Sequence, residues 1–250
     1  MSAAAFELAL VAEGPDDRRT CVAIVDRLLC DEIDWITRDH LASHRSWRGI
    51  DVGDEFVQWR AVLSAARNRG LRAHGHFGDH PGEPDAFTAR LALRLFASLD
   101  PVPAAVLLVR DADDQPERRR GLEQARKSGQ WPFRVVIGLA AAKRECWVLR
   151  AFVTRDVGET DKLKELRREL GFDPILQAHE LHAQQIDAKR SAKRVLASLV
   201  GDEVNRESDC WDHVDLRRLG DQSDGTGLLE FVLELRTLLL PLWGVGSNRR

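Results

Sequence analysis

A run of apolar residues that ends in three carboxylates constrains the fold of this chain more than any other feature. The sequence AAVLLVRDADDQ occupies residues 104–115, and every residue from Ala104 to Val109 is apolar. An uninterrupted apolar segment of this length is typical of a strand at the centre of a parallel sheet, where helices cover both faces. Ligands bind beyond the carboxyl ends of such strands. Asp111, Asp113 and Asp114 therefore lie where a site is expected.

The pattern of apolar residues alternates between strand and helix over the first 150 residues. We expect strands at 6–14, 71–77, 104–111 and 133–140, and helices at 15–34, 53–70, 84–100, 116–129 and 141–153. Four further segments are helical, at 160–170, 187–200, 209–218 and 226–241. This order predicts an α/β fold with a Rossmann-like, mostly parallel sheet flanked by helices. We expect the core to span residues 1–155 and a helical C-terminal extension, residues 156–250, to pack on it.

Composition excludes several classes of protein. No apolar run approaches the roughly 20 residues that cross a bilayer. The N-terminal sequence MSAAAFELALVAEG lacks a basic region and its apolar run contains Glu7, so it is not typical of a signal peptide. We therefore expect a cytoplasmic protein that does not engage a membrane. The four cysteines form no C-x-x-C pair, which argues against a zinc site.

The acidic residues after two strands predict a metal site. Glu13 ends the first expected strand, and Asp111 and Asp113 end a later one. If these strands are parallel neighbours, the three carboxylates meet at one edge of the sheet, and Mg²⁺ or Mn²⁺ would relieve their repulsion. Asp17, four residues after Glu13, is a candidate ligand for a second ion. The alternative is that such aspartates serve as turn formers and helix caps. We expect Asp114 to cap a helix or to support the ligands, and not to bind the ion itself.

Two motifs carry a resemblance to a known family. The sequence LVAEGPDD, followed much later by LLVRDADD, resembles the Toprim fold, and its E-G-x-x-D form resembles the overcoming-lysogenization-defect (OLD) nucleases and their stand-alone relatives. The segment AKRECWVLRAF, residues 142–152, is similar to a helix of small Toprim proteins of the DUF4276 type. The resemblance covers roughly residues 5–155 and implies a Toprim-like sheet. It also implies that Glu13, Asp111 and Asp113 bind metal.

The same resemblance implies roles for two further acids. Asp17 occupies a position where OLD-type sequences often carry a Glu or Asp. Glu145 occupies the E-x-W position and is a candidate catalytic acid; the alternative is a surface glutamate on an amphipathic helix. The chain departs from the family pattern between its first helix and residue 71, where at least one extra helix is expected.

Histidines and basic residues supply further candidates. His74, His76 and His80 lie close together in a polar segment, which is either a zinc or acid–base cluster or simply a polar loop. The segment DAKRSAKRVLASL places four basic residues on one expected helical face. Such a face suits phosphate contacts, although a solvated surface is the more common explanation. These residues are Lys189, Arg190, Lys193 and Arg194. OLD-type nucleases use a lysine late in the Toprim region, and Lys193 is the candidate for that role.

Together the motifs predict a metal-dependent nuclease that acts on DNA or RNA. The resemblance implies a setting in antiviral defence with a partner ATPase of the ABC or AAA type, because the chain carries no P-loop of its own. The absence of tyrosine excludes the topoisomerase use of the Toprim fold. Two alternatives remain: a phosphotransferase or phosphatase acting on small molecules, and a non-catalytic Toprim scaffold within an ATPase complex. The Leu-rich face at 228–242 either closes the core or forms a homo-oligomer.

Overall fold

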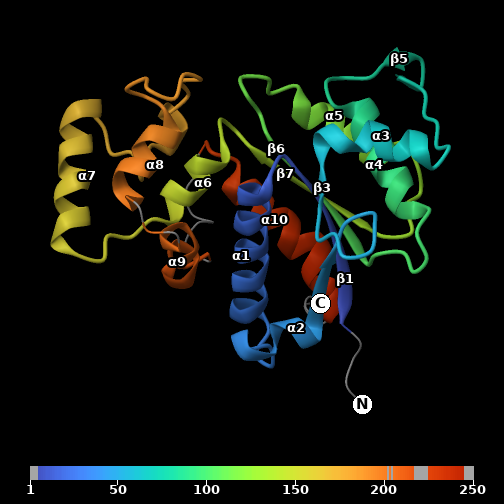
Figure 1. The fold of residues 1–250 in the computed structure, drawn as a ribbon, viewed down its shortest axis with the longest axis horizontal. Coiled ribbons are helices and arrows are strands. Elements are labelled where there is room, and N and C mark those ends of the chain that lie inside the picture. Colours follow the sequence, from blue (N-terminus) through green and yellow to red (C-terminus); the bar gives the residue numbers. More distant parts are fainter. Residues whose placement is uncertain (1–4, 202, 204, 217–224, 245–250) are drawn as a thin grey trace, which may run out of the picture. The chain divides into compact units, whose positions relative to one another are not determined.

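The structure of the chain is a computed structural model (Figure 1), and it describes residues 5–201, 203, 205–216 and 225–244. The end of the helix expected at 209–218 lies outside this part. The chain divides into two compact units. The first comprises Met1–Arg110, Gln115–Gly138 and Leu233–Arg250, and the second comprises Asp111–Asp114 and Leu139–Val232. The expected domain boundary at residue 155 stays a prediction about which parts fold independently.

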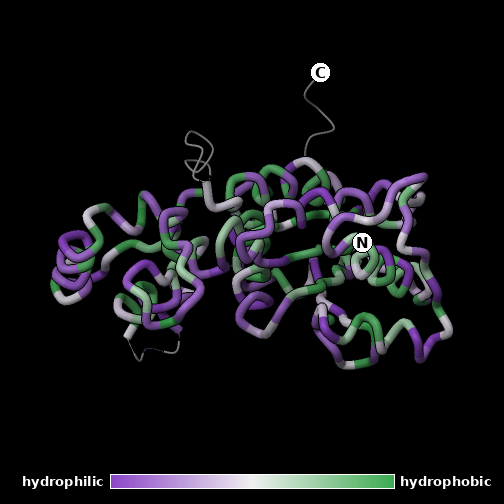
Figure 2. Tube along the Cα trace, turned by 90° about the horizontal axis from the view of Figure 1, so that it is seen from above, coloured by the Kyte–Doolittle hydropathy of each residue, from purple (hydrophilic) through white to green (hydrophobic). Residues whose placement is uncertain are grey.

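A mostly parallel sheet forms the centre of the first unit, as predicted. Its order is β2-β1-β6-β7, and β3 also pairs with β1. The strands are β1 (Phe6–Ala12), β2 (Arg45–Arg48), β3 (Val57–Gln58), β6 (Ala105–Asp111) and β7 (Arg134–Ala140). β1 and β6 are parallel neighbours, with Val11 beside Leu108. Because their inner residues are fully buried, both strands are apolar on both faces, and Figure 2 shows these segments in green.

Helices cover this sheet. They are α1 (Pro15–Glu32), α2 (Leu41–His44), α3 (Val62–Asn68), α4 (Ala86–Ala97) and α5 (Arg118–Lys127). Figure 1 shows α1 beside the sheet and α3, α4 and α5 grouped together, with α4 packed against both of the others. Gly121 permits this packing, because a Cβ atom at that position would lie only 1.8 Å from the Pro84 carbonyl oxygen.

The second unit is helical. It contains α6 (Arg144–Ala151), α7 (Val157–Leu170), α8 (Ala192–Val200) and α9 (Arg206–His213). α6 packs against α8 and α9, and α7 packs against α8. Trp147 of α6 stacks on Phe231 with ring centroids 5.1 Å apart. Phe231 belongs to α10 (Leu228–Glu234), which continues into a π-helical turn, Leu235–Leu239, and a 3-10 turn, Leu240–Trp243.

Three sequence expectations require correction. The segment expected as a helix at 53–70 contains β3 and a 3-10 turn before α3 begins at Val62. The strand expected at 71–77 is only one arm of a short antiparallel hairpin, β4 (His76–Phe77) and β5 (His80–Pro81). The helix expected at 187–200 begins at Ala192 and has Ser191 as its N-cap, so Lys189 and Arg190 precede it and do not share its face.

One alternative left open by the sequence concerns the Leu-rich face at 228–242. The apolar side chains Leu228, Phe231, Leu235 and Leu239 are completely buried in the single chain, so the Leu-rich face closes the core. Among the described helices, none combines the length and hydrophobicity that a membrane span requires.

Candidate functional site

The turn after β6 holds its acidic residues in an uncommon backbone conformation. Asp111 is the last residue of β6, and the Ala112 N–H donates to the Ala140 carbonyl at 2.8 Å. Asp113 and Asp114 follow with φ values of 46° and 61°. Left-handed backbone of this kind costs on the order of 1 kcal/mol per non-glycine residue and collects at functional sites. The acidic turn is therefore held by its surroundings and not by its own preference.

Four charged side chains of the second unit gather at this turn, and we call them the acid–lysine cluster: Asp111, Asp113, Lys143 and Glu145. The Arg144 N–H donates to Asp111 Oδ1 at 2.8 Å, and Lys143 Nζ lies 3.3 Å from Asp113 Oδ1. Partial burial alone would lower the pKa of Lys143. The hydrogen bond and charge of Asp113, followed by the charges of Asp111 and Glu145, raise this pKa overall. The cluster therefore contains a lysine that stays protonated at neutral pH.

The start of α6 explains why these residues meet. Lys143 is the N-cap and has extended backbone, with φ −147° and ψ 157°, so its side chain leaves the helix toward Asp113. The first N–H of α6, that of Arg144, faces Asp111. The positive end of a helix favours a carboxylate at this place. Glu145, in the first turn, is only 13% exposed and pairs with Arg144 at 3.5 Å, so it is not a solvated surface glutamate.

Lys143, and not the chosen candidate Lys193, is the lysine that the structure places beside the acids. Lys193 is an exposed residue of α8, and the described part of the chain shows no ion pair for it. Its neighbour Arg194 is bound to Glu169 at 2.8 Å. The signal for Lys143 was present in the sequence, because it directly precedes Glu145 and the E-x-W helix.

Asp114 does not cap α5, which leaves the supporting role as the other expectation for this residue. The N-cap of α5 is Glu117, which makes no side-chain capping bond. Asp114 instead accepts a hydrogen bond from Gln184 Nε2 at 2.7 Å. This hydrogen bond ties the last residue of the acidic turn to Gln184.

The first unit holds the two remaining predicted acids, Glu13 and Asp17. Glu13 directly follows β1 and lies at the edge of ion-pair range, 3.9 Å from Arg110 Nε. Asp17 Oδ2 accepts a hydrogen bond from the Gly14 N–H at 2.9 Å and so satisfies the start of α1. The parallel neighbours that the metal prediction required, β1 and β6, are present. The sharing of an ion by Glu13, Asp111 and Asp113 stays a prediction, as does the role of Asp17 at a second ion.

The three candidate histidines lie in an exposed segment of the first unit. His74, His76 and His80 are exposed, the last two on the β4–β5 hairpin. Arg90 fixes this hairpin by donating to the carbonyls of His74 and His76. The exposure of all three side chains agrees with the polar-loop alternative, and the role of the cluster stays a prediction.

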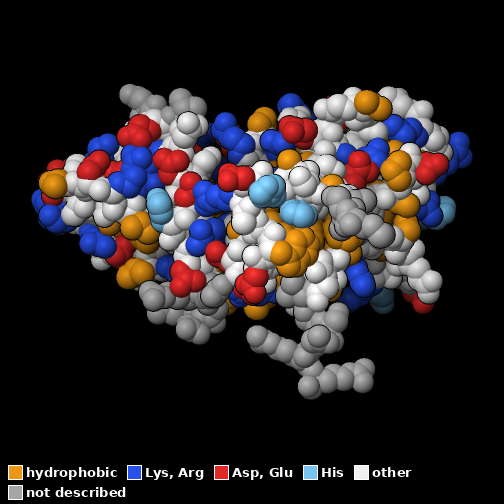
Figure 3. Space-filling model, turned by 90° about the horizontal axis from the view of Figure 1, so that it is seen from below, with side chains coloured by type: hydrophobic (Ala, Val, Ile, Leu, Met, Phe, Trp, Pro, Cys, Tyr) orange, Lys and Arg blue, Asp and Glu red, His pale blue; other side chains and the backbone are white. Residues whose placement is uncertain are grey.

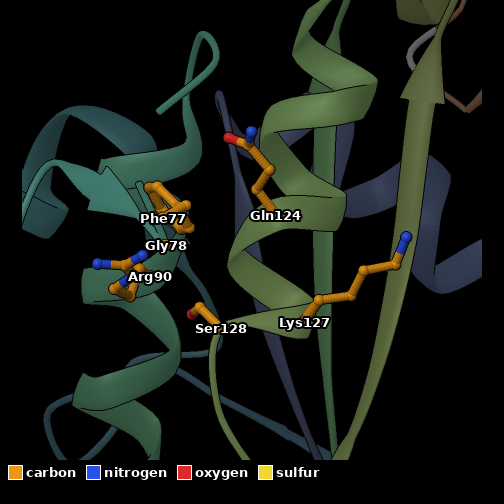
Figure 4. Close-up of a pocket in the computed structure, with 6 residues that line it drawn as sticks. All are labelled: Phe77, Gly78, Arg90, Gln124, Lys127 and Ser128. Carbon is orange, nitrogen blue, oxygen red and sulfur yellow. The ribbon is translucent and has the colours of Figure 1, made fainter. Parts of the chain in front are cut away.

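A pocket of about 310 Å³ lies beside that hairpin and carries no acid. Its lining residues are Phe77, Gly78, Arg90, Gln124, Lys127 and Ser128. Figure 4 shows Arg90 against Phe77, with Lys127 pointing away from both. The Arg90 guanidinium lies 3.4 Å from the centre of the Phe77 ring. Arg90 holds the hairpin in place, and none of the six lining residues carries a carboxylate, the ligand expected for Mg²⁺. The strand ends, and not this pocket, are therefore the candidate site.

Among the described residues, no group of three or more His, Cys, Asp or Glu side chains is arranged to hold an ion. Figure 3 shows basic and acidic side chains interspersed on one face of the molecule. Any attraction for a polyanion must therefore arise from local groups, as the net charge of −3 also indicates.

No protein-family model, no curated protein and no solved structure matches this chain.

Proposed function

We propose that this chain is a metal-dependent nuclease with a Toprim-like fold, in which Asp111 and Asp113 bind Mg²⁺ or Mn²⁺. The observation that carries the proposal is the acid–lysine cluster at the carboxyl end of β6. Lys143 Nζ lies 3.3 Å from Asp113 Oδ1, and Asp111 and Glu145 add to the negative charge around this lysine. At this edge of a parallel sheet, the carboxylates suit the binding of a metal ion, and the protonated Lys143 beside them suits the binding of a phosphate.

The donor set fits a hard divalent cation. Mg²⁺ is commonly bound through one or two carboxylates and completes its shell with water or phosphate oxygens. Asp111 and Asp113 supply two carboxylates two residues apart, and Glu13 is the third acid that the sequence pattern predicts. Lys143 compensates the charge of Asp113, so the acids are held together at a tolerable electrostatic cost when no cation is bound.

Each group then has a task in phosphodiester hydrolysis. When bound, the metal would polarise the phosphate and lower the pKa of an attacking water. Lys143 stays protonated because of the surrounding carboxylates, so it stabilises negative charge on the phosphate without giving up its proton. The Arg144 N–H fixes the direction of the Asp111 carboxylate. Glu145 adds, after Asp113 and Asp111, to the negative charge that raises the pKa of Lys143.

The test is cleavage of a panel of nucleic acids with Mg²⁺ or Mn²⁺. Plasmid, linear DNA, single-stranded DNA and transfer RNA would be incubated with wild type and with Asp111→Asn/Asp113→Asn. We expect cleavage by wild type and its loss in the double variant. Activity on small phosphoesters alone would favour a phosphatase instead, and absence of all metal-dependent activity would contradict the proposal, unless an added partner ATPase restored it.

The two lysines give a matched comparison within the same assay. Lys143→Gln removes the charge beside Asp113, whereas Lys193→Gln removes a charge from the exposed face of α8. We expect kcat to fall by about 100-fold or more for the first substitution and to change little for the second. The reverse order would show that the lysine at the reacting phosphate is Lys193.

A further inference from the structure

Two arginines of the first unit pair with the same carboxylate, that of Asp85, at the carboxyl end of the sheet. Arg110 Nε lies 2.8 Å from Asp85 Oδ2, and Arg118 Nε lies 3.3 Å from the same oxygen. The three side chains are only 11–17% exposed. We call Arg110 and Arg118 the arginine pair. Asp85 therefore pairs with both guanidinium groups at a place that is largely shielded from solvent.

The surroundings hold this arrangement in place. The Arg110 guanidinium lies 5.2 Å from the centre of the Trp59 ring, and the Trp59 indole N–H donates to the Val109 carbonyl at 2.7 Å. Arg110 is therefore fixed by an aromatic ring that is itself tied to β6. A guanidinium held in this way loses little conformational entropy when it binds an anion.

The backbone of Asp85 has a strained, left-handed conformation. It is the N-cap of α4 but makes no side-chain capping bond, and its φ of 66° lies in the left-handed region. The preceding residue, Pro84, is held against α5, where Gly121 leaves room for its carbonyl. An aspartate that gives up its capping bond to lie between two arginines acts as an internal substitute for an anion.

The position of the arginine pair indicates which anion Asp85 substitutes for. Arg110 directly precedes Asp111, and Arg118 follows the acidic turn as the first residue of α5. The two arginines thus bracket the proposed metal ligands along the chain. The second negative charge near Arg110 is Glu13, at 3.9 Å, which the sequence pattern assigns to the metal.

We infer that the arginine pair binds a phosphate of the nucleic-acid backbone, and that Asp85 occupies the pair until the substrate displaces it. This inference rests on the proposed nuclease function, which it extends by naming the residues that hold the polymer. Paired guanidinium groups are well suited to phosphate oxygens, because each can donate two parallel hydrogen bonds. Such contacts fix the position of the backbone without reading its sequence.

The test is equilibrium binding of a fluorescent single-stranded oligonucleotide, followed by anisotropy over a range of salt concentrations. Ca²⁺ would replace Mg²⁺ so that binding is measured without turnover. We expect Arg110→Met and Arg118→Met each to weaken binding by roughly tenfold at low salt, and to reduce the slope of log Kd against log salt by about one.

Asp85→Asn provides the decisive variant, because its effect has the opposite sign. Asparagine tolerates left-handed backbone and removes the competing charge, so we expect binding to tighten by roughly three- to tenfold. A purely structural role for Asp85 predicts unchanged or weaker binding, and that result in a folded variant would overturn the inference. Circular dichroism and thermal midpoints would establish folding.

Arg45→Met serves as the matched control. Arg45 forms a comparable two-bond pair with Asp26, at 2.7 and 2.5 Å, and is similarly shielded from solvent. We expect no change in binding, and an equal loss in this variant would overturn the inference. Cleavage measured separately keeps the two proposals distinct. Binding through the arginine pair without cleavage contradicts the nuclease, whereas cleavage with binding insensitive to these variants contradicts the inference.

Discussion

Replacing Glu159 by glutamine is expected to destabilise the second unit strongly and in a pH-dependent manner. Glu159 of α7 is almost fully buried and receives two hydrogen bonds from Arg206 of α9, at 2.6 and 2.9 Å. The Arg155 N–H adds a third at 2.8 Å. The Arg206 guanidinium also lies 4.2 Å from the centre of the Phe152 ring. This pair therefore joins α7 to α9 through contacts that exclude water.

The magnitude follows from the pKa of Glu159. The hydrogen bonds from Arg206, opposed by burial and assisted by the Arg155 N–H, lower this pKa from 4.5 to about 2. Since one pKa unit corresponds to about 1.4 kcal/mol, ionised Glu159 stabilises the fold by about 3 kcal/mol at neutral pH. Because the folded pKa lies below the unfolded one, this stabilisation is complete above the unfolded pKa and is lost as the pH falls through the folded pKa. About half is lost by pH 3.

The assay is hydrogen exchange of α7 and α9, combined with urea unfolding between pH 7 and pH 3. We expect Glu159→Gln to lower the free energy of opening by about 3 kcal/mol at pH 7, because Arg206 is left buried without its partner. The difference from wild type should shrink toward pH 3. Glu169→Gln, which removes the exposed partner of Arg194, should cost less than about 1 kcal/mol. Equal effects of the two substitutions, or a difference independent of pH, would refute this reasoning.

Further predictions concern a close backbone approach and the buried thiols. Gly227 has φ 81°, and a Cβ atom there would lie 2.1 Å from a carbonyl oxygen; Gly227→Ala should therefore cost more than about 2 kcal/mol in urea unfolding. Gly171 has the same φ with no atom nearby, so Gly171→Ala should cost only about 1 kcal/mol; equal costs would contradict the role of the close contact. Burial raises the pKa of both Cys146 and Cys210 to about 12. In the folded protein at pH 8, iodoacetamide should therefore modify the partly exposed Cys30 first, and mass spectrometry that found Cys146 or Cys210 labelled first would contradict this order.

The central strands and most helices could be predicted from the sequence because burial determines their residues. β1 and β6 lie inside the sheet, and their interiors therefore contain only apolar side chains. β2 could not be predicted, because the sequence RSWR contains two arginines. The structure explains them: Arg45 pairs with Asp26 and Arg48 pairs with Glu7, at 2.5 and 2.6 Å. These partners are distant in sequence, so no local pattern reveals an edge strand of this kind.

The candidate site was predicted only in part for a similar reason. Asp111 and Asp113 follow an apolar strand, which is a local signal. The importance of Lys143 depends on where α6 begins, since a helix starting at residue 141 would have carried this lysine away in its first turn. Because α6 begins at Arg144, Lys143 has extended backbone and reaches Asp113. The link between Arg110 and Asp85 likewise depends on the tertiary fold, because these residues lie on separate elements.

Binding of Mn²⁺ to the purified protein, followed by electron paramagnetic resonance, tests the central claim most directly, because it requires no knowledge of the substrate. Wild type, Asp111→Asn/Asp113→Asn and Glu169→Gln would be titrated under identical conditions. We expect saturable Mn²⁺ binding to wild type and to Glu169→Gln, and a loss of affinity of at least about tenfold in the double variant. Undiminished Mn²⁺ affinity in the double variant would contradict a metal site at the end of β6.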